Sequence, residues 1–389
     1  MSLFLITFFL LYGGLHLYAF LKVRAAFSPG IILSIIICFF MVFMILAPML
    51  VRMIEKEGLE TLATGFAYGG YTWMAAILIF FVTGLCTDIF RLIIHVSGAL
   101  FGKNVSAITS ANLVYFIICL VASIFVVIYG SFEARNIKTE YIVIKTKKIS
   151  AELGRVRIAQ ISDVHLGMVV GEERLKAIIK TIQQSKPDIL VSTGDLLDAQ
   201  PDKVEIYIGL IKEVYTPYEK FAVTGNHEVY LDRQYKKDKD NKDWSAKLTS
   251  KAGFVLLDKD VRNVKGILNI VGVGDEAGGG FRRGDNTNEE SLCSKIEPSQ
   301  FTVLLKHRPV PYTGTLCTYD LQLSGHTHKG QIFPFFFITR LFFQHYAGLY
   351  ELSNKTYLYV SRGSGTWGPP IRFLAPPEVT IIDLVHRSN

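Results

Sequence analysis

Long apolar runs fill the first third of the chain. Four of them reach the length of about 20 residues that a helix needs to cross the hydrocarbon core of a bilayer. They cover, approximately, residues 3–21, 30–51, 68–87 and 110–130. We therefore expect residues 1–131 to form a transmembrane anchor of about four helices, with room for the third to continue as an interfacial helix through Asp88, Arg91 and His95.

No charged residue lies in the middle of any of these runs. Ion and substrate pathways need ionisable groups inside the membrane, so the pattern favours an anchor over a transporter or a channel. No positive residue precedes the first run and no convincing small-residue cleavage site follows it, so we expect the run to be retained and not removed as a signal peptide.

From residue 139 the pattern changes to short β-branched runs that alternate with helical periodicity. Residues 155–161 have the pattern of a strand, and residues 172–185 that of a helix whose Leu and Ile residues recur on one face. Further strands are expected at residues 188–192, 220–224, 268–273, 301–305, 320–323 and 357–360. The alternation predicts an α/β domain over residues 139–389.

The distribution of charge separates the same two parts. The chain has 389 residues with 41 Lys and Arg against 34 Asp and Glu, a net charge of +7, and only 19% of its residues are charged. Ten charged residues fall within residues 1–130 and the other 65 fall in the rest, which has the charged fraction of an ordinary soluble protein. The composition excludes a wholly soluble enzyme, a disordered chain and a disulfide-dense secreted module.

The weak positive excess bears on partners and orientation. It contains no block of like charges, so nucleic acid is not an expected partner, whereas a bilayer with anionic lipid is. With four spans, seven Lys and Arg flank the side that carries the α/β domain and four flank the other, which favours a multi-pass protein of the cell membrane with a cytoplasmic domain. Three of the seven belong to the start of the folded domain, where this rule is weak. A Lys/Asp-rich run at residues 232–243 is expected to be a solvated loop or helix end.

The five cysteines predict neither a zinc site nor redox chemistry. Cys38, Cys86 and Cys119 fall in apolar runs, and Cys293 and Cys317 are isolated without a C-x-x-C spacing. We expect them to be small buried apolar residues.

Five of the expected strands end in carboxylate, amide or imidazole side chains. In chain order these are Asp163 and His165, then Asp195 and Asp198, then Asn226, His227 and Glu228, then His307, and finally His326 and His328. Ligands of open α/β sheets gather at the carboxyl ends of strands, so we expect these side chains in one crevice. A single Asp or His at a strand end is usually a cap or turn residue, but five such ends in succession indicate a site.

The same side chains suit a pair of divalent cations. Carboxylates and imidazoles fit Mn²⁺, Fe²⁺ or Zn²⁺, and no cysteine is near enough for a closed structural zinc site. Two cations about 3.5–4 Å apart, bridged by a carboxylate and a water, would lower the pKa of that water towards about 7. The resulting hydroxide would be a nucleophile for phosphoryl groups. Glycines at 194, 225 and 325 would let the backbone approach the ions closely.

The ordered motifs resemble those of the calcineurin-like dinuclear metallophosphoesterases. D-x-H, G-D-x-x-D, G-N-H-E, H and G-H-x-H stand in this order between residues 163 and 328. The resemblance implies a four-layer α/β/β/α sandwich with the site at its rim. It assigns the first metal to Asp163, His165, Asp195 and His328, and the second to Asp195, Asn226, His307 and His326.

The resemblance also assigns roles to two residues that are not ligands. His227 would donate a proton to the leaving oxygen or stabilise the transition state, and Asp198 would accept from the far side of its imidazole and fix the tautomer.

Segments around the last motif are similar to the membrane-associated bacterial branch of that family. They are G-H-T-H-K-G-Q-I at residues 325–332, Y-V-S-R-G-S-G at 359–365 and P-I-R-F at 370–373. Some relatives in that branch cleave the pyrophosphate of UDP-2,3-diacylglucosamine, so the resemblance implies a phosphodiester or pyrophosphate bond in a lipid-linked substrate. Protein phosphatases of the superfamily carry an arginine after the second motif, where this chain has Ala199 and Gln200, so a phosphoprotein substrate is disfavoured.

An aromatic run and one arginine complete the candidate substrate site. Residues 333–343 are rich in Phe and could dip into the membrane interface to admit a phosphorylated lipid, or could form a buried hairpin beneath the site. Arg362 could bind a substrate phosphate with its planar fork, or could form a structural salt bridge.

The sequence therefore predicts a membrane-anchored, metal-dependent phosphoesterase. The alternative is a catalytically silent membrane sensor that binds metal or a phosphorylated ligand. His227 and Asp198 favour the enzyme, because binding a metal requires neither of them.

Overall fold

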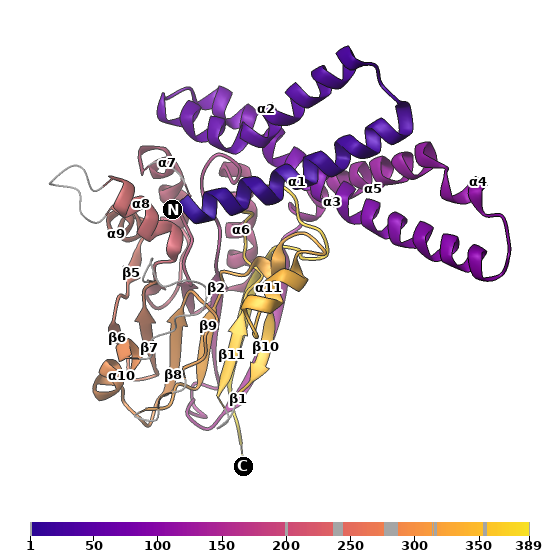
Figure 1. The fold of residues 1–389 in the computed structure, drawn as a ribbon. Coiled ribbons are helices and arrows are strands. Elements are labelled where there is room, and N and C mark those ends of the chain that lie inside the picture. Colours follow the sequence, from indigo (N-terminus) through magenta and orange to yellow (C-terminus); the bar gives the residue numbers. More distant parts are fainter. Residues whose placement is uncertain are drawn as a thin grey trace. The chain divides into compact units, whose positions relative to one another are not determined.

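The computed structural model describes residues 2–198, 201–235, 244–275, 287–312, 314, 317–352 and 356–388 (Figure 1). The chain divides into two compact units. One comprises Met1–Phe132 with Gly368–Ile371, and the other comprises Glu133–Trp367 with Arg372–Asn389.

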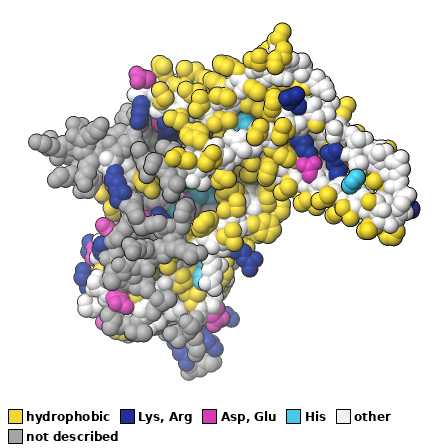
Figure 2. Space-filling model, viewed as in Figure 1, with side chains coloured by type: hydrophobic (Ala, Val, Ile, Leu, Met, Phe, Trp, Pro, Cys, Tyr) yellow, Lys and Arg dark blue, Asp and Glu magenta, His cyan; other side chains and the backbone are white. Residues whose placement is uncertain are grey.

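The N-terminal unit is helical. Its elements are α1 (Ser2–Phe27), α2 (Ile31–Lys56), α3 (Glu60–Leu100), α4 (Ser106–Thr109) and α5 (Asn112–Glu133). All but α4 are long and apolar enough to cross a membrane, with mean hydropathy between 1.5 and 2.9 over their most apolar windows. Hydrophobic side chains cover much of the face of these helices that Figure 2 shows. The four predicted runs are thus confirmed as helices, and α3 continues without a break through Asp88 and Arg91.

Polar contacts join the helices of this unit at two levels. Asp88 accepts a hydrogen bond from the Tyr18 hydroxyl at 2.7 Å and pairs with Lys22. At a second place, between α1 and α3, the Trp73 indole N–H donates to His16 Nε2 at 2.9 Å. These contacts satisfy polar groups that would otherwise face hydrocarbon.

The second unit is built on two six-stranded sheets. The first has the order β1 (Lys138–Thr146), β12 (Glu378–His386), β2 (Arg155–Ile161), β3 (Ile189–Ser192), β4 (Lys220–Ala222) and β5 (Phe254–Leu256). The second has the order β10 (Gly348–Glu351), β11 (Tyr357–Val360), β9 (Leu321–Ser324), β8 (Phe301–Lys306), β7 (Leu268–Val273) and β6 (Asp260–Val264).

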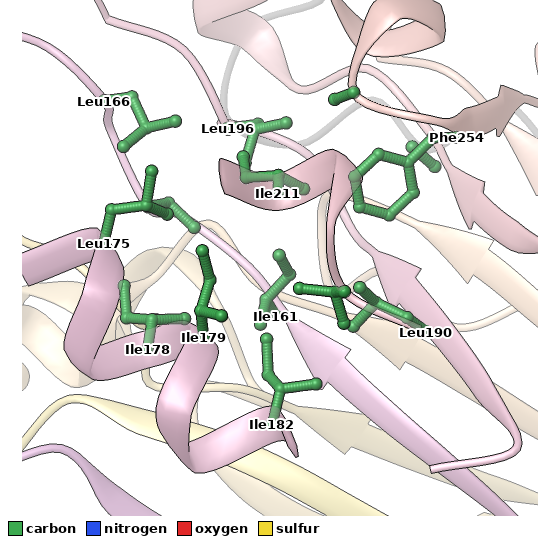
Figure 3. Packing of buried hydrophobic residues seen from close by; sticks show 14 of the residues in the cluster. Ile161, Leu166, Leu175, Ile178, Ile179, Ile182, Leu190, Leu196, Ile211 and Phe254 are labelled. Atoms are coloured by element: carbon green, nitrogen blue, oxygen red, sulfur yellow. The ribbon is translucent and has the colours of Figure 1, made fainter. Parts of the chain in front are cut away.

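Apolar clusters hold the layers together. Helices α6 (Glu172–Ser185), α7 (Pro201–Lys212) and α9 (Trp244–Lys251) pack on the first sheet. Figure 3 shows this contact, in which Ile179 and Ile182 of α6 face Ile161 of the sheet. The other face of that sheet packs on the second sheet, and the second sheet packs on α10 (Thr287–Leu292). The predicted α/β/β/α sandwich is confirmed.

Local patterning accounts for the elements with the clearest periodicity. Residues 172–185 form α6 with the predicted bounds, because Leu175, Ile178, Ile179 and Ile182 all face the core. Glu172 and Glu173 lie in the first turn, where negative charge complements the helix dipole.

The prediction that the cysteines are small buried apolar residues is confirmed for Cys119 and wrong for the other four. Cys293 and Cys317 form a disulfide across 24 residues, a proximity that sequence spacing does not reveal. Cys38 and Cys86 are exposed on the apolar helices, and only Cys119 is buried and free. Within the Lys/Asp-rich run, Asp232 accepts hydrogen bonds from Ser245, and residues 236–243 lie outside the described part of the chain.

Candidate metal centre

The ends of five strands bring together the side chains expected to meet. Parallel strands β2, β3 and β4 deliver the first three sets, and parallel strands β8 and β9 deliver the last two. Three groups of three result, each with ligand atoms within 4.8 Å of one another, and one of them, formed by His165, Asp195 and His227, shares a residue with each of the other two. We call Asp163, His165 and His328 group A, and Asp195, His307 and His326 group B.

All three residues of group A are buried. The Nε2 atoms of His165 and His328 face each other at 3.0 Å, and Nε2 of His328 lies 3.6 Å from Asp163 Oδ1. The Asp163 carboxylate also accepts hydrogen bonds from the Ser162 hydroxyl at 2.5 Å and from the backbone N–H of His326 at 3.0 Å. Its orientation is therefore fixed from two strand ends.

Group B has a similar arrangement. Nε2 of His307 lies 3.2 Å from Asp195 Oδ2 and 3.1 Å from Nδ1 of His326. The other ring nitrogen of His307, Nδ1, donates to the Thr193 carbonyl at 2.8 Å, so Nε2 is the nitrogen that faces the group. Asp195 also lies 4.0 Å from Nε2 of His165, so its carboxylate reaches both groups.

The donor atoms fit a pair of divalent cations. In each group two imidazole nitrogens point at each other at about 3 Å, an arrangement that is repulsive unless a proton or a cation lies between the lone pairs. Asn226 Oδ1, an atom that can only accept, is buried without a hydrogen-bond partner among the described residues. Mixed carboxylate, imidazole and amide donors suit Mn²⁺, Fe²⁺ or Zn²⁺.

The backbone around these side chains is unusual. Asp163, His165, Asp195, His326 and His328 all have positive φ, between 49° and 72°. Such conformations cost of order 1–3 kcal/mol each and occur where the surroundings over-determine them. They turn the side chains inward immediately after the strands, which the sequence pattern alone does not predict.

Two glycines are required by close approach. A Cβ on Gly225 would lie 2.2 Å from Asp195 Oδ1, and one on Gly325 would lie 1.9 Å from the Ser162 hydroxyl oxygen. The expectation that these glycines let the backbone approach the site is consistent with this geometry.

Glu228 stabilises the turn that carries Asp195. Its buried carboxylate accepts from the backbone N–H groups of Asp195 at 2.9 Å, Leu197 at 2.9 Å and Gly225 at 2.8 Å. The residue stands within the G-N-H-E motif, but its role could not be assigned from the sequence because the partners are backbone groups 31 and 33 residues away.

His227 lies beside group A with Asp198 behind it. Its Nδ1 is 2.9 Å from Asp198 Oδ1, and its backbone N–H donates to Asp195 Oδ1 at 2.9 Å. Burial opposes the charge on His227, but Asp195 and Asp198 outweigh it and raise the pKa to about 9. The ring can therefore hold a proton at neutral pH.

The carboxylates and imidazoles of the two groups change each other's pKa. Burial alone would raise the pKa of Asp195, but the charges of His307 and His227 hold it well below its usual range. Burial likewise opposes the charge on His307, but Asp195 and Asp163 raise its pKa to about 10. A proton on His307 thus supplies part of the positive charge that the carboxylates favour.

Arg362 forms ion pairs with two carboxylates. Its Nε lies 2.5 Å from Glu378 Oε2, and its Nη2 donates to Glu140. The structural salt bridge that the sequence left open is therefore present, and a contact with substrate phosphate stays a prediction.

The aromatic run lies next to group B and is largely exposed. It forms α11 (Phe336–Phe342), in which Phe337 is 58% and Leu341 74% exposed. The buried Phe343 that follows packs its ring 5.3 Å from that of His326. The alternative of a buried hairpin is wrong for most of this run.

Comparisons with known proteins agree with this arrangement. A family model described as calcineurin-like phosphoesterase matches residues 156–330. An uncharacterised metallophosphoesterase of Aquifex aeolicus is 34% identical over 262 residues, which cover 67% of this chain and 97% of the relative. One of Campylobacter jejuni is 32% identical over 317 residues, 80% of this chain and 79% of the relative. A transmembrane protein with metallophosphoesterase domain from Bos taurus is 29% identical over 245 residues, 60% of this chain and 54% of the relative.

Proposed function

The chain belongs to the calcineurin-like metallophosphoesterase family, and from that premise we propose that it is a membrane-anchored hydrolase of phosphoric ester bonds with two metal ions. The observation that carries the proposal is the Asp195 carboxylate, which lies within reach of both ligand groups. A carboxylate in that position can hold two cations close enough to act on one substrate.

We assign the residues as follows. Asp163, His165, Asp195 and His328 hold the first cation, and Asp195, Asn226, His307 and His326 hold the second. Mn²⁺, Fe²⁺ or Zn²⁺ in these positions would lower the pKa of a shared water towards about 7, so that it is available as hydroxide, and would neutralise phosphoryl oxygens. His227 holds the proton that the leaving oxygen takes up, and Asp198 fixes its ring.

The proposed substrate is a lipid-linked phosphodiester or pyrophosphate, as in hydrolases of UDP-2,3-diacylglucosamine. Two observations support it. The chain has four helices that could cross a membrane, so its substrate site is tethered to a bilayer. The exposed apolar helix α11 also lies next to group B, through the contact between Phe343 and His326.

Two observations bear on the side of the membrane, and they differ. Seven flanking Lys and Arg against four favour the cytoplasm, but four of the seven lie in β1 or directly after it, which leaves three against four. The disulfide between Cys293 and Cys317 supports an oxidising compartment, because disulfides are rare in the cytosol. We therefore propose a multi-pass protein with its catalytic domain on the extracytoplasmic side, in place of the cytoplasmic side that the charge counts favour.

Metal content and turnover together test the proposal. The full chain in detergent should bind two Mn²⁺ and hydrolyse bis-p-nitrophenyl phosphate, and a panel of phospholipids and nucleotide-linked lipids should then identify the bond that it prefers. Asp195→Asn should lose metal from both groups and activity with it. Retention of both metals without turnover of any phosphoester would favour a silent sensor.

A further inference from the structure

Arg372 is the bulkiest of the fully buried side chains, with no exposed surface. A buried guanidinium is usually paired with a carboxylate, but the hydrogen bonds of Arg372 go to backbone carbonyls and to an imidazole. Nε donates to Gly365 O at 3.1 Å, and Nη1 donates to the carbonyls of His328 at 3.1 Å, Arg362 at 2.7 Å and Ala375 at 3.2 Å. Nη2 donates to Gly365 O at 2.5 Å and to His328 Nδ1 at 2.9 Å.

The first target of this side chain is a residue of group A. Arg372 contacts both the carbonyl and the ring of His328, so it fixes the backbone turn and the rotation of the imidazole together. The opposite ring nitrogen, Nε2, is the one that faces His165 and Asp163. A small rotation of the ring would move Nε2 out of group A.

Arg372 is also linked to Asp163, through the backbone of Gly365. Arg372 holds the carbonyl of Gly365, and the N–H of Gly365 donates to the carbonyl of Asp163 at 3.0 Å. The contact is close, since a Cβ on Gly365 would lie 1.9 Å from Val164 O. One buried side chain therefore connects the two strand ends that carry Asp163 and His328.

We propose that Arg372 is a positioning residue for the first metal, an inference that rests on the proposed function. Its planar fork holds His328 and the Asp163 turn in the geometry that a cation requires. Residues that orient metal ligands typically contribute 10–100-fold to metal affinity. Because Arg372 contacts no member of group B in the described structure, its loss should weaken one metal site and spare the other.

Lysine should not replace this arginine. It has one nitrogen on a flexible stem, whereas Arg372 uses all three guanidinium nitrogens in fixed directions. Arg372→Lys keeps the positive charge but loses the planar guanidinium. Arg372→Met keeps the apolar bulk but loses both the charge and the guanidinium. Arg157→Met is the matched control, because Arg157 forms a two-pronged pair with Asp383 at 2.7 Å in the same unit, through partners that belong to neither group.

The experiment measures Mn²⁺ binding to the full chain in detergent by equilibrium dialysis, and the spin coupling of the bound ions by electron paramagnetic resonance. Wild type should bind two Mn²⁺ with a coupled signal. Both Arg372 variants should keep one site at wild-type affinity, lose 10–100-fold at the other, and show an uncoupled signal when one ion is bound. Arg157→Met should unfold at a lower temperature and still bind a coupled pair.

Three results would overturn the inference. The first is Arg372→Lys with both affinities within about threefold of wild type. The second is an equal loss at both sites. The third is failure of Arg372→Lys to fold while Arg157→Met folds, which would assign Arg372 to folding alone. The proposed function is tested separately, by measurements on the wild-type chain. If it bound two Mn²⁺ but hydrolysed no phosphoester, the proposed activity would be contradicted, whereas the positioning role of Arg372 would not.

Discussion

At His227, two carboxylates act on one imidazole. Asp198 faces Nδ1 at 2.9 Å and Asp195 accepts from the backbone N–H, which leaves the ring protonated at neutral pH. We predict that His227→Ala lowers kcat by about 10²–10⁴-fold, because a general acid typically contributes that much. Metal content, measured on the same sample, should stay at the wild-type value. A loss smaller than about tenfold would contradict the role.

Protons and cations compete for His307. Asp195 and Asp163 raise its pKa to about 10 against the effect of burial, so the metal-free protein holds a proton there at pH 7. Metal must displace that proton, so Mn²⁺ affinity should increase with pH, by up to about tenfold for each unit below pH 10. Titration at pH 6.5, 7.5 and 8.5 measures the slope, and calorimetry in two buffers counts the released protons. An affinity independent of pH would be inconsistent with a protonated His307.

The sequence indicated the residues of groups A and B because each follows a strand at a spacing that short motifs preserve. It did not indicate the roles of Glu228 and Arg372. Their partners are backbone groups brought close only by the fold, such as the N–H of Asp195 and the carbonyl of Gly365. Arg362 was ambiguous for the same reason, since Glu378 and Glu140 are distant in sequence.

Among the elements, α11 makes the most specific prediction about substrate. Phe337 and Leu341 expose apolar surface that a bilayer would cover, worth roughly 1.5–3 kcal/mol for each side chain if fully buried. Phe337→Ser with Leu341→Ser should lower hydrolysis of a liposome-borne substrate by about tenfold or more and leave that of bis-p-nitrophenyl phosphate unchanged.

The control for α11 is Tyr215→Ser, which removes an aromatic side chain that is 79% exposed between α7 and β4. It should change neither rate. Equal losses on the liposome-borne and the water-soluble substrate in the α11 variant would argue against a role in lipid access.

Periodicity located some elements and not others. β2 and α6 have the predicted bounds because their apolar positions repeat clearly over 7 and 14 residues. β4 and β5 have three residues each, too few for a period to be recognised with its ends. β12 pairs in parallel with β1 and antiparallel with β2, so its place in the sheet depends on contacts more than 200 residues apart that no local pattern contains.

For the whole molecule, removal of metal should be measurable as a loss of stability. Without cations, burial raises the pKa of the Asp163 carboxyl to about 6, because the charge of His307 offsets that burial only in part. Chelation should lower the unfolding temperature by about 5–10 °C for each site that is held at about 100 times its Kd. Differential scanning fluorimetry with and without EDTA measures the shift. Asp195→Asn should show little further change with EDTA, and an equal shift in wild type and variant would contradict metal binding at these groups.

The disulfide leads to a prediction about orientation. A membrane-impermeant maleimide should label Tyr215→Cys in intact cells, because Tyr215 is exposed on the unit that carries Cys293 and Cys317. Under denaturing conditions, those two native cysteines should react only after reduction. Labelling of Tyr215→Cys that requires permeabilised cells would contradict an extracytoplasmic domain.

On the proposed extracytoplasmic side, the bridge between Cys293 and Cys317 would also limit which lipid the enzyme can meet. A domain that folds where thiols are oxidised has no access to head groups on the inner leaflet. The proposed lipid substrate would then have to be flipped outward first, and its supply would depend on a separate flippase.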